Sequence, residues 1–381
     1  MSELVISNAR VVTRDAVLHG AVQVRDGVIA DVSDVPALLP GAIDFDGDYL
    51  LPGLVELHTD NLERHASPRP GVRWPAEAAV VAHDVQIAGA GITTVFDALA
   101  VGDVIEGSSR LASLTAMTGA VQAMNDAGAL KAEHWLHLRC EVSYHDLPAL
   151  LQPFVEHPRV RLVSLMDHTP GQRQFARLDK YTEYYMGKYG FTDAQMQRFI
   201  EDKCADQARY SARHREHVIE LCRRRGLPLA SHDDATADHI EEAAACGSVV
   251  AEFPTTVEAA RAARERRIKV MGGAPNFVRG GSHSGNVSAR ELADHALVDI
   301  LSSDYVPASL LHAAFLMADG DPGALPAAVA SVSATPAAAI GLDDRGAIAP
   351  GLQADLIRVA EAPGMRFPVV RAVWRRGERI A

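Results

Sequence analysis

Eight short apolar runs, each followed by a stretch with helical character, most constrain how this chain can fold. They lie at 51–58, 92–98, 134–142, 160–168, 227–233, 248–253, 268–274 and 298–304. Near-continuous apolar runs of this length are typical of parallel strands buried on both faces. Eight strand–helix units predict an α/β fold of the TIM type, a (β/α)₈ barrel, with a doubly wound open sheet as the structural alternative.

Alternation of apolar and polar residues at both ends of the chain predicts a second, smaller domain. We expect residues 1–50 and 345–381 to pair into a small β-sandwich, and residues 51–344 to form the barrel. The segment 169–213 is long for a strand–helix connection and rich in aromatic and basic residues. It predicts a lid or substrate loop.

The net charge and the cysteine content exclude some classes of partner. The chain has 381 residues and a net charge of −12, which disfavours nucleic acid and anionic membranes as partners. No apolar run reaches the roughly 18 residues of a membrane span, and the first residues do not resemble a signal peptide. Four scattered cysteines indicate reduced thiols and a cytoplasmic protein. A small-molecule partner is therefore expected, and a homo-oligomer stays open.

Polar side chains with metal-binding chemistry stand where predicted strands end. His58 and Asp60 lie two residues apart, so an extended backbone points both the same way. The other strand-end candidates are Glu141, His168, His232 and Asp304. Imidazole and carboxylate groups without cysteine predict a divalent metal such as Zn²⁺, with Mn²⁺ as the alternative. Any one histidine alone is more often structural; the joint occurrence carries the prediction.

Asp304 is the candidate catalytic residue. A bound metal would lower the pKa of water, and Asp304 could take the proton and pass it to the leaving group. The alternative is that Asp304 only caps the helix that follows it.

A glycine-rich loop predicts contacts with phosphate oxygens. The stretch GGAPNFVRGGSHSGNVSA at 272–289 contains Arg279 and His283, and it falls between strands seven and eight, where barrels often bind phosphate. Arg173, in HTPGQRQF, and Lys188 are further basic candidates for substrate binding. The alternatives are a loop that only turns a corner and basic side chains that are only solvated.

Long motifs carry a family resemblance. LLPGLVELHTDNLERH, SLMDHTPGQRQF, KYTEYYMGKYG, LASHDDAT, GAPNFVRGGSHSGN and ILSSDYVPASLLHAAF resemble the amidohydrolase superfamily. Within it, they are similar to the α-D-ribose 1-methylphosphonate 5-triphosphate diphosphatases. The resemblance implies a metal-dependent barrel holding one or two ions. It also implies cleavage of a 5-triphosphate to a 5-phosphate and pyrophosphate, in the phosphonate catabolism that leads to carbon–phosphorus bond cleavage.

The chain departs from the wider superfamily pattern at two places. The usual pair of histidines on the first strand is here His58 and Asp60, and the usual carboxylated lysine is absent. Glu141 is the natural substitute as a bridging ligand. His168 and His232 end strands four and five, where the common pattern uses five and six, and strand six ends near Glu252.

Two other functions compete with phosphoric anhydride hydrolysis. The first is hydrolysis of a carbon–nitrogen bond on the same barrel, by a cyclic amidase or a deaminase, because fold alone does not fix the reaction. The second is a metal-free barrel that serves as a scaffold, which the presence of the ligands disfavours. The basic loops favour a polyanionic substrate.

Overall fold

The barrel is the central feature of the computed structural model, which describes residues 3–69, 71–103, 109–173, 178–282, 285–362, 364 and 367–381. Eight parallel strands form one sheet in the order of the chain, from β6 to β13. They are β6 (Leu54–Thr59), β7 (Ile92–Val101), β8 (Glu133–Glu141), β9 (Val160–Met166), β10 (Leu229–His232), β11 (Ser248–Glu252), β12 (Lys269–Gly273) and β13 (Ile300–Ser302). Each of the eight predicted runs overlaps one of these strands, and the predicted (β/α)₈ barrel is confirmed.

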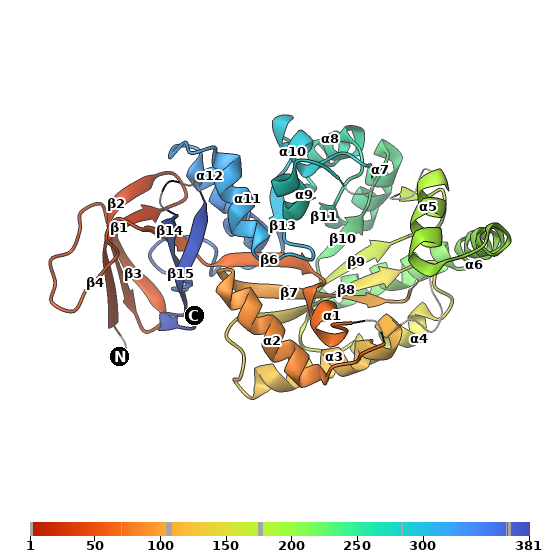
Figure 1. Cartoon of the computed structure of the whole chain (residues 1–381), viewed down its shortest axis with the longest axis horizontal. Coiled ribbons are helices and arrows are strands. Elements are labelled where there is room, and N and C mark those ends of the chain that lie inside the picture. The colour runs from red at the N-terminus through yellow and green to blue at the C-terminus, as the bar shows by residue number, and fades with distance from the viewer. Residues whose placement is uncertain are drawn as a thin grey trace.

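Helices connect the strands and cover the outside of the barrel (Figure 1). They are α1 (Asn61–Ala66), α2 (Ala76–Gly89), α3 (Ser109–Asp126), α4 (Leu147–Leu151), the 3₁₀ turn η1 (Gln152–Phe154), α5 (Leu178–Tyr189), α6 (Asp193–Arg225), α7 (Ala237–Cys246), α8 (Val257–Glu265), α9 (Ala274–Arg279), α10 (Ala289–Asp294), α11 (Ser309–Ala318), α12 (Leu325–Ala330) and α13 (Ala334–Ala339). In the described part of the chain, none of them combines the length and the apolarity that crossing a bilayer requires.

Burial on both faces explains why the strands read as continuous apolar runs. All ten residues of β7 are buried. Phe96 packs with Leu162 and Val250 inside the barrel, whereas Leu99 and Leu138 belong to the core between the strands and the surrounding helices. Each fully buried side chain of this size contributes roughly 1.5–3 kcal/mol, so the two cores dominate the stability of the barrel.

The barrel closes between β6 and β13, a contact that we call the barrel seam. Thr59 and Asp304 form a single ladder bridge there, within the part of the chain that the structure describes. The Glu56 carboxylate accepts hydrogen bonds from the Ser302 hydroxyl at 2.8 Å and from the Ser303 N–H at 2.6 Å. Burial raises the pKa of Glu56 to about 7, although the hydrogen bonds from Ser303 act in the opposite direction. The buried hydrogen bonds of Glu56 thus join β6 to β13 where the backbone ladder between the two strands is short.

Both ends of the chain form a second, mostly antiparallel sheet. Its strands are β1 (Glu3–Val12), β2 (Val17–Arg25), β3 (Val28–Ser33), β4 (Ile43–Asp44), β5 (Tyr49–Pro52), β14 (Leu356–Glu361), β15 (Pro368–Arg375) and β16 (Glu378–Arg379). The order is β16-β15-β14-β5-β1-β2-β3, with β4 beside β1. β5 therefore joins the N-terminal strands to the C-terminal ones.

This terminal sheet curls around a core of its own. The Ile29 N–H donates to Leu352 O, and the Gly351 N–H donates to Ile29 O, both at 2.9 Å, so the edge strand β3 meets the segment before β14. Inside, the Phe45 ring stacks on the Trp374 ring, with centroids 5.9 Å apart. The predicted small β-sandwich domain built from both termini is confirmed, and Figure 1 shows it at one end of the molecule.

At the opposite end of the molecule, the segment after β9 forms α5 and the long helix α6 (Figure 1). α6 has 33 residues; it begins with a capping box between Thr192 and Gln195 and ends at Gly226, whose φ of 62° is readily adopted by glycine. Tyr181, Tyr185 and Met196 form a small buried cluster between α5 and α6. The described part of the predicted lid segment is thus largely helical.

Candidate metal centre

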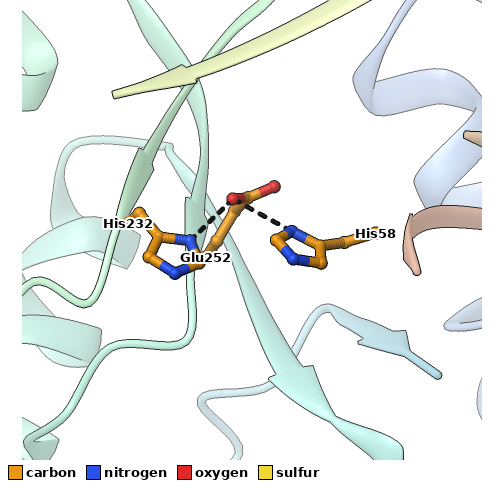
Figure 2. Close-up of side chains that lie close together, drawn as sticks. All are labelled: His58, His232 and Glu252. Carbon is orange, nitrogen blue, oxygen red and sulfur yellow. Dashed lines mark hydrogen bonds and ion pairs between the residues drawn. The ribbon is translucent and has the colours of Figure 1, made fainter. Parts of the chain in front are cut away.

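The carboxyl ends of three barrel strands bring His58, His232 and Glu252 together. The Oε2 atom of Glu252 lies 3.2 Å from His58 Nδ1 and 2.9 Å from His232 Nδ1. The two imidazole rings are nearly parallel, with centroids 5.5 Å apart. Figure 2 shows the Glu252 carboxylate between the two rings. All three side chains are buried, and their candidate ligand atoms lie within 4.8 Å of one another.

A second group adjoins the first and shares His232. It consists of His168, His232 and Asp233, whose candidate ligand atoms also lie within 4.8 Å of one another. The Oδ2 atom of Asp233 lies 3.3 Å from His232 Nε2 and 3.9 Å from His168 Nε2. Asp233 directly follows β10 with a left-handed φ of 54°, a conformation that is uncommon outside glycine and frequent at functional sites. The arrangement offers two neighbouring positions for a cation.

The state of these groups fits metal binding. Burial, and then the positive charge of Arg139, hold the pKa of His58 well below its ordinary value, and burial does the same for His232. Both imidazoles are therefore neutral near pH 7, as a metal ligand must be. Within the described ranges, His58 Nδ1, Asp233 Oδ2 and Glu252 Oε1 are buried without a hydrogen bond. Such atoms are costly to bury, and a cation would satisfy them.

Glu141, the predicted bridging ligand, is paired with His168. Its Oε2 atom lies 2.6 Å from His168 Nδ1, and its Oε1 atom accepts hydrogen bonds from the Ser143 hydroxyl and the His168 N–H. Burial lowers the pKa of His168, but the Glu141 charge outweighs this effect and raises it overall. Glu252, rather than Glu141, is the carboxylate between two histidines from different strands.

Asp304 lies at the barrel seam, two residues after the end of β13. Its N–H donates to His58 O at 3.2 Å, and its O accepts the Asp60 N–H at 3.1 Å. Burial, and then the nearby Asp60 charge, raise the pKa of Asp304 to about 7. Asp304 also has a left-handed φ of 52°. Asp60 and Asp304 are thus neighbours, and the backbone of each is tied to the other.

Arg173 is buried, and its guanidinium has several hydrogen-bond acceptors. Its guanidinium donates to the carbonyl oxygen of His232 at 3.2 Å, to the Asp234 carboxylate, and to Glu242 at 3.1 Å. Only 6% of its surface is exposed. These contacts favour a role in holding the end of β10, because they use much of the hydrogen-bonding capacity of the guanidinium within the protein. Substrate binding by Arg173 stays a prediction.

Among the remaining predicted substrate residues, the structure describes the side chain of Arg279 alone. Arg279 is exposed and is the last residue of α9, which follows β12. His283 lies outside the described residues, as does the side chain of Lys188 on α5.

The sequence predictions missed three residues of this centre. The sequence places Glu252 only at the end of strand six and predicts no role for Asp233 or Arg139. Asp233 follows His232 directly in the motif LASHDDAT, which was the available signal. Arg139 alternates with His137 and Glu141 along β8, so its inward direction could have been read from the strand period.

A further cluster of candidate ligands lies on the outer face of the barrel, where it binds α2 to the strands. Asp97 accepts from both His83 Nε2 and His134 Nδ1 at 2.8 Å, while His134 Nε2 lies 3.2 Å from Asp84 and His83 Nδ1 lies 3.0 Å from the Asn61 amide. Every ring nitrogen of the two histidines already has a partner. This arrangement is typical of a satisfied structural network.

The histidine–carboxylate groups at the carboxyl ends of the barrel strands form a candidate metal centre of the kind that metal-dependent hydrolases use. The model of the amidohydrolase family matches residues 76–381. The α-D-ribose 1-methylphosphonate 5-triphosphate diphosphatase of Escherichia coli strain K12 is 50% identical over 379 residues, which cover 99% of this chain and all of the relative. The chain belongs to the amidohydrolase family.

Solved structures share the fold at low sequence identity. N-isopropylammelide isopropylaminohydrolase from Burkholderia multivorans superimposes with a TM-score of 0.66 at 19% identity, covering 100% of this chain and 98% of that one. The 5-methylcytosine deaminase from Klebsiella pneumoniae gives 0.62 at 17% identity, covering 99% and 98%. At these identities the likeness shows the fold alone.

Proposed function

We propose that this chain hydrolyses α-D-ribose 1-methylphosphonate 5-triphosphate to the 5-phosphate and pyrophosphate, as a step in phosphonate catabolism. The observation that carries the proposal is the convergence of His58, His232 and Glu252 in a chain half identical, over its whole length, to a diphosphatase of that name. A cytoplasmic setting is part of the proposal, and the four free cysteines support it.

The proposal also covers which metal is bound and how many ions there are. His58, His232 and Glu252 would hold one ion. A second ion beside His168 and Asp233 would need another ligand in place of His232, because a neutral imidazole has one free lone pair. We propose Zn²⁺, with Mn²⁺ as the alternative, because imidazole and carboxylate ligands suit both. When bound, the metal supplies a Lewis acid that polarises phosphoryl oxygens and lowers the pKa of water.

The residues of the chain carry the proton and the charge. Water adds to a phosphorus beside the bridge between the α and β phosphates, and the bridging oxygen leaves with the other phosphorus. Asp304 accepts the proton of that water and returns it to the leaving oxygen. Arg279, after β12, is proposed to bind the outer phosphates, because a guanidinium matches phosphate oxygens in a bidentate way.

The test is a product assay on the protein loaded with Zn²⁺ or Mn²⁺. The 5-triphosphate of ribose 1-methylphosphonate should release pyrophosphate, and a cyclic amide and an aminopyrimidine should stay intact. Ring opening or ammonia release without pyrophosphate would overturn the proposal in favour of carbon–nitrogen bond hydrolysis. Mass measurement in ¹⁸O-labelled water then shows which product receives the oxygen, and hence which phosphorus is attacked.

A further inference from the structure

Arg139 places a guanidinium inside the barrel, on the strand that ends in Glu141. Alternate residues of β8 (Glu133–Glu141) face the same side of the sheet. His137, Arg139 and Glu141 therefore share one face. His137 faces the barrel interior, since its ring lies 5.1 Å from that of His58 and its Nε2 atom lies 3.6 Å from Glu252. Arg139 thus lies on the inward face of β8, two residues before Glu141.

Arg139 has no partner in the part of the chain that the structure describes. Only 9% of its surface is exposed, and its Nε atom is buried without a hydrogen bond. Among the described residues, Arg173 and Arg345 are buried to a similar degree, and both are paired. Arg173 donates to Asp234 and Glu242, and Arg345 donates to Glu133 and Asp344. Leaving a buried guanidinium unpaired opposes folding, so the chain keeps Arg139 at a cost in stability.

The charge of Arg139 acts on the centre of the site. After burial, it is the next cause that lowers the pKa of His58. Burial raises the pKa of Asp304 and of Asp233, and the charge of Arg139 opposes this rise in both. These groups come from β6 and from the segments after β10 and β13. Arg139 lies two residues before the end of β8 on its inward face, which places its side chain near the same strand ends.

We propose that Arg139 binds a phosphoryl oxygen of the substrate and neutralises the charge that develops on it during hydrolysis. The inference rests on the proposed function and names a residue that this function did not include. A guanidinium that is buried beforehand and has free N–H groups needs little rearrangement to receive a phosphate. Its planar fork matches two phosphoryl oxygens, whereas the ammonium of lysine acts as a point charge.

The experiment compares Arg139→Met with Arg345→Met, because both remove a buried guanidinium and only the second breaks ion pairs. Binding of inorganic tripolyphosphate is measured by calorimetry, together with Tm, metal content and kcat/KM for the 5-triphosphate. Arg139→Met should weaken tripolyphosphate binding and lower kcat/KM by about ten- to a hundredfold, with Tm unchanged or higher. Arg345→Met should lower Tm and leave the tripolyphosphate affinity of the folded protein unchanged.

Arg139→Lys is a second test, since lysine keeps the positive charge but cannot bind two phosphoryl oxygens as a planar guanidinium does. An affinity between those of the wild type and Arg139→Met is expected. If Arg139→Met binds tripolyphosphate as the wild type does and loses Tm instead, Arg139 only balances the buried carboxylates, and the proposal is wrong. A wild type that releases no pyrophosphate overturns the proposed function, whereas an active wild type with an unaffected Arg139→Met overturns this inference alone.

Discussion

The Thr59 hydroxyl donates a hydrogen bond to the carbonyl oxygen of Asp304 over 2.6 Å, across the barrel seam. The Asp60 N–H donates to the same oxygen at 3.1 Å. The proposed proton acceptor is thereby fixed through its backbone to the strand that carries His58. The same hydrogen bonds close the barrel and orient Asp304. A substitution at the barrel seam should therefore change kcat.

Thr59→Val should lower both stability and kcat, because the valine keeps the shape of threonine and loses the hydroxyl donor. The lost hydrogen bond should cost about 1 kcal/mol, and kcat should fall several-fold as Asp304 loosens. Thr93→Val is the matched control, since the buried Thr93 hydroxyl has no hydrogen-bond partner among the described residues. Equal kcat in the two variants would contradict the link between seam and turnover.

Asp304→Asn should reduce kcat by at least about a hundredfold, because an amide cannot accept the proton of the attacking water at neutral pH. The backbone contacts of Asp304 do not depend on its side chain, so the fold should persist. Pyrophosphate release and Tm are measured together. A near-normal rate would assign Asp304 to a structural role at the start of the following segment.

Glu252→Gln should lower the metal content more than Glu141→Gln does. The Glu252 carboxylate lies between His58 and His232, whereas Glu141 is paired with His168. The two substitutions are chemically identical and both positions are buried. Metal per chain is measured after dialysis against a fixed free metal concentration. The reverse order of metal loss would restore Glu141 as the bridging ligand.

The stability that His134 contributes should decline in mild alkali. Burial opposes its charged form, but Asp97 and Asp84 outweigh this and raise its pKa to about 9. Because the folded pKa lies above the unfolded value of 6.5, the contribution is full below pH 6.5 and is lost as the pH rises through 9. The loss should be on the order of 3 kcal/mol.

The measurement is Tm against pH for the wild type and His134→Gln. The difference between the two Tm values should be largest near pH 6 and should narrow by pH 9.5. A difference that stays constant or widens with pH would mean that His134 is neutral in the folded protein.

The fold could be predicted from the sequence because each barrel strand is buried on both faces and therefore appears as an apolar run. The site was harder to predict, because its contacts join strands that are distant in the chain. The order of residues brings His58 and Asp60 to the same strand end, but only the packing of the barrel shows that Glu252 lies between His58 and His232.

Charge pairing explains the other differences. Arg173 resembles a loop arginine in the sequence, and its partner Asp234 lies 61 residues later in the chain. Arg139 lies within an apolar run and the sequence predicts no role for it, so only the lack of a partner in the described structure sets it apart. The sequence does not show which buried arginine has an acceptor, since the acceptors come from other strands.

The pairing of β5 with β14 also has a consequence for synthesis on the ribosome. β5 ends at Pro52 and its antiparallel partner β14 begins at Leu356, about 300 residues later. At roughly 5–20 residues per second, the edge of β5 that pairs with β14 stays unpaired for about 15–60 s while the barrel is translated. The earliest strands of the protein are therefore completed by some of the last, and a nascent chain that stalls inside the barrel exposes an open sheet edge to chaperones or to aggregation.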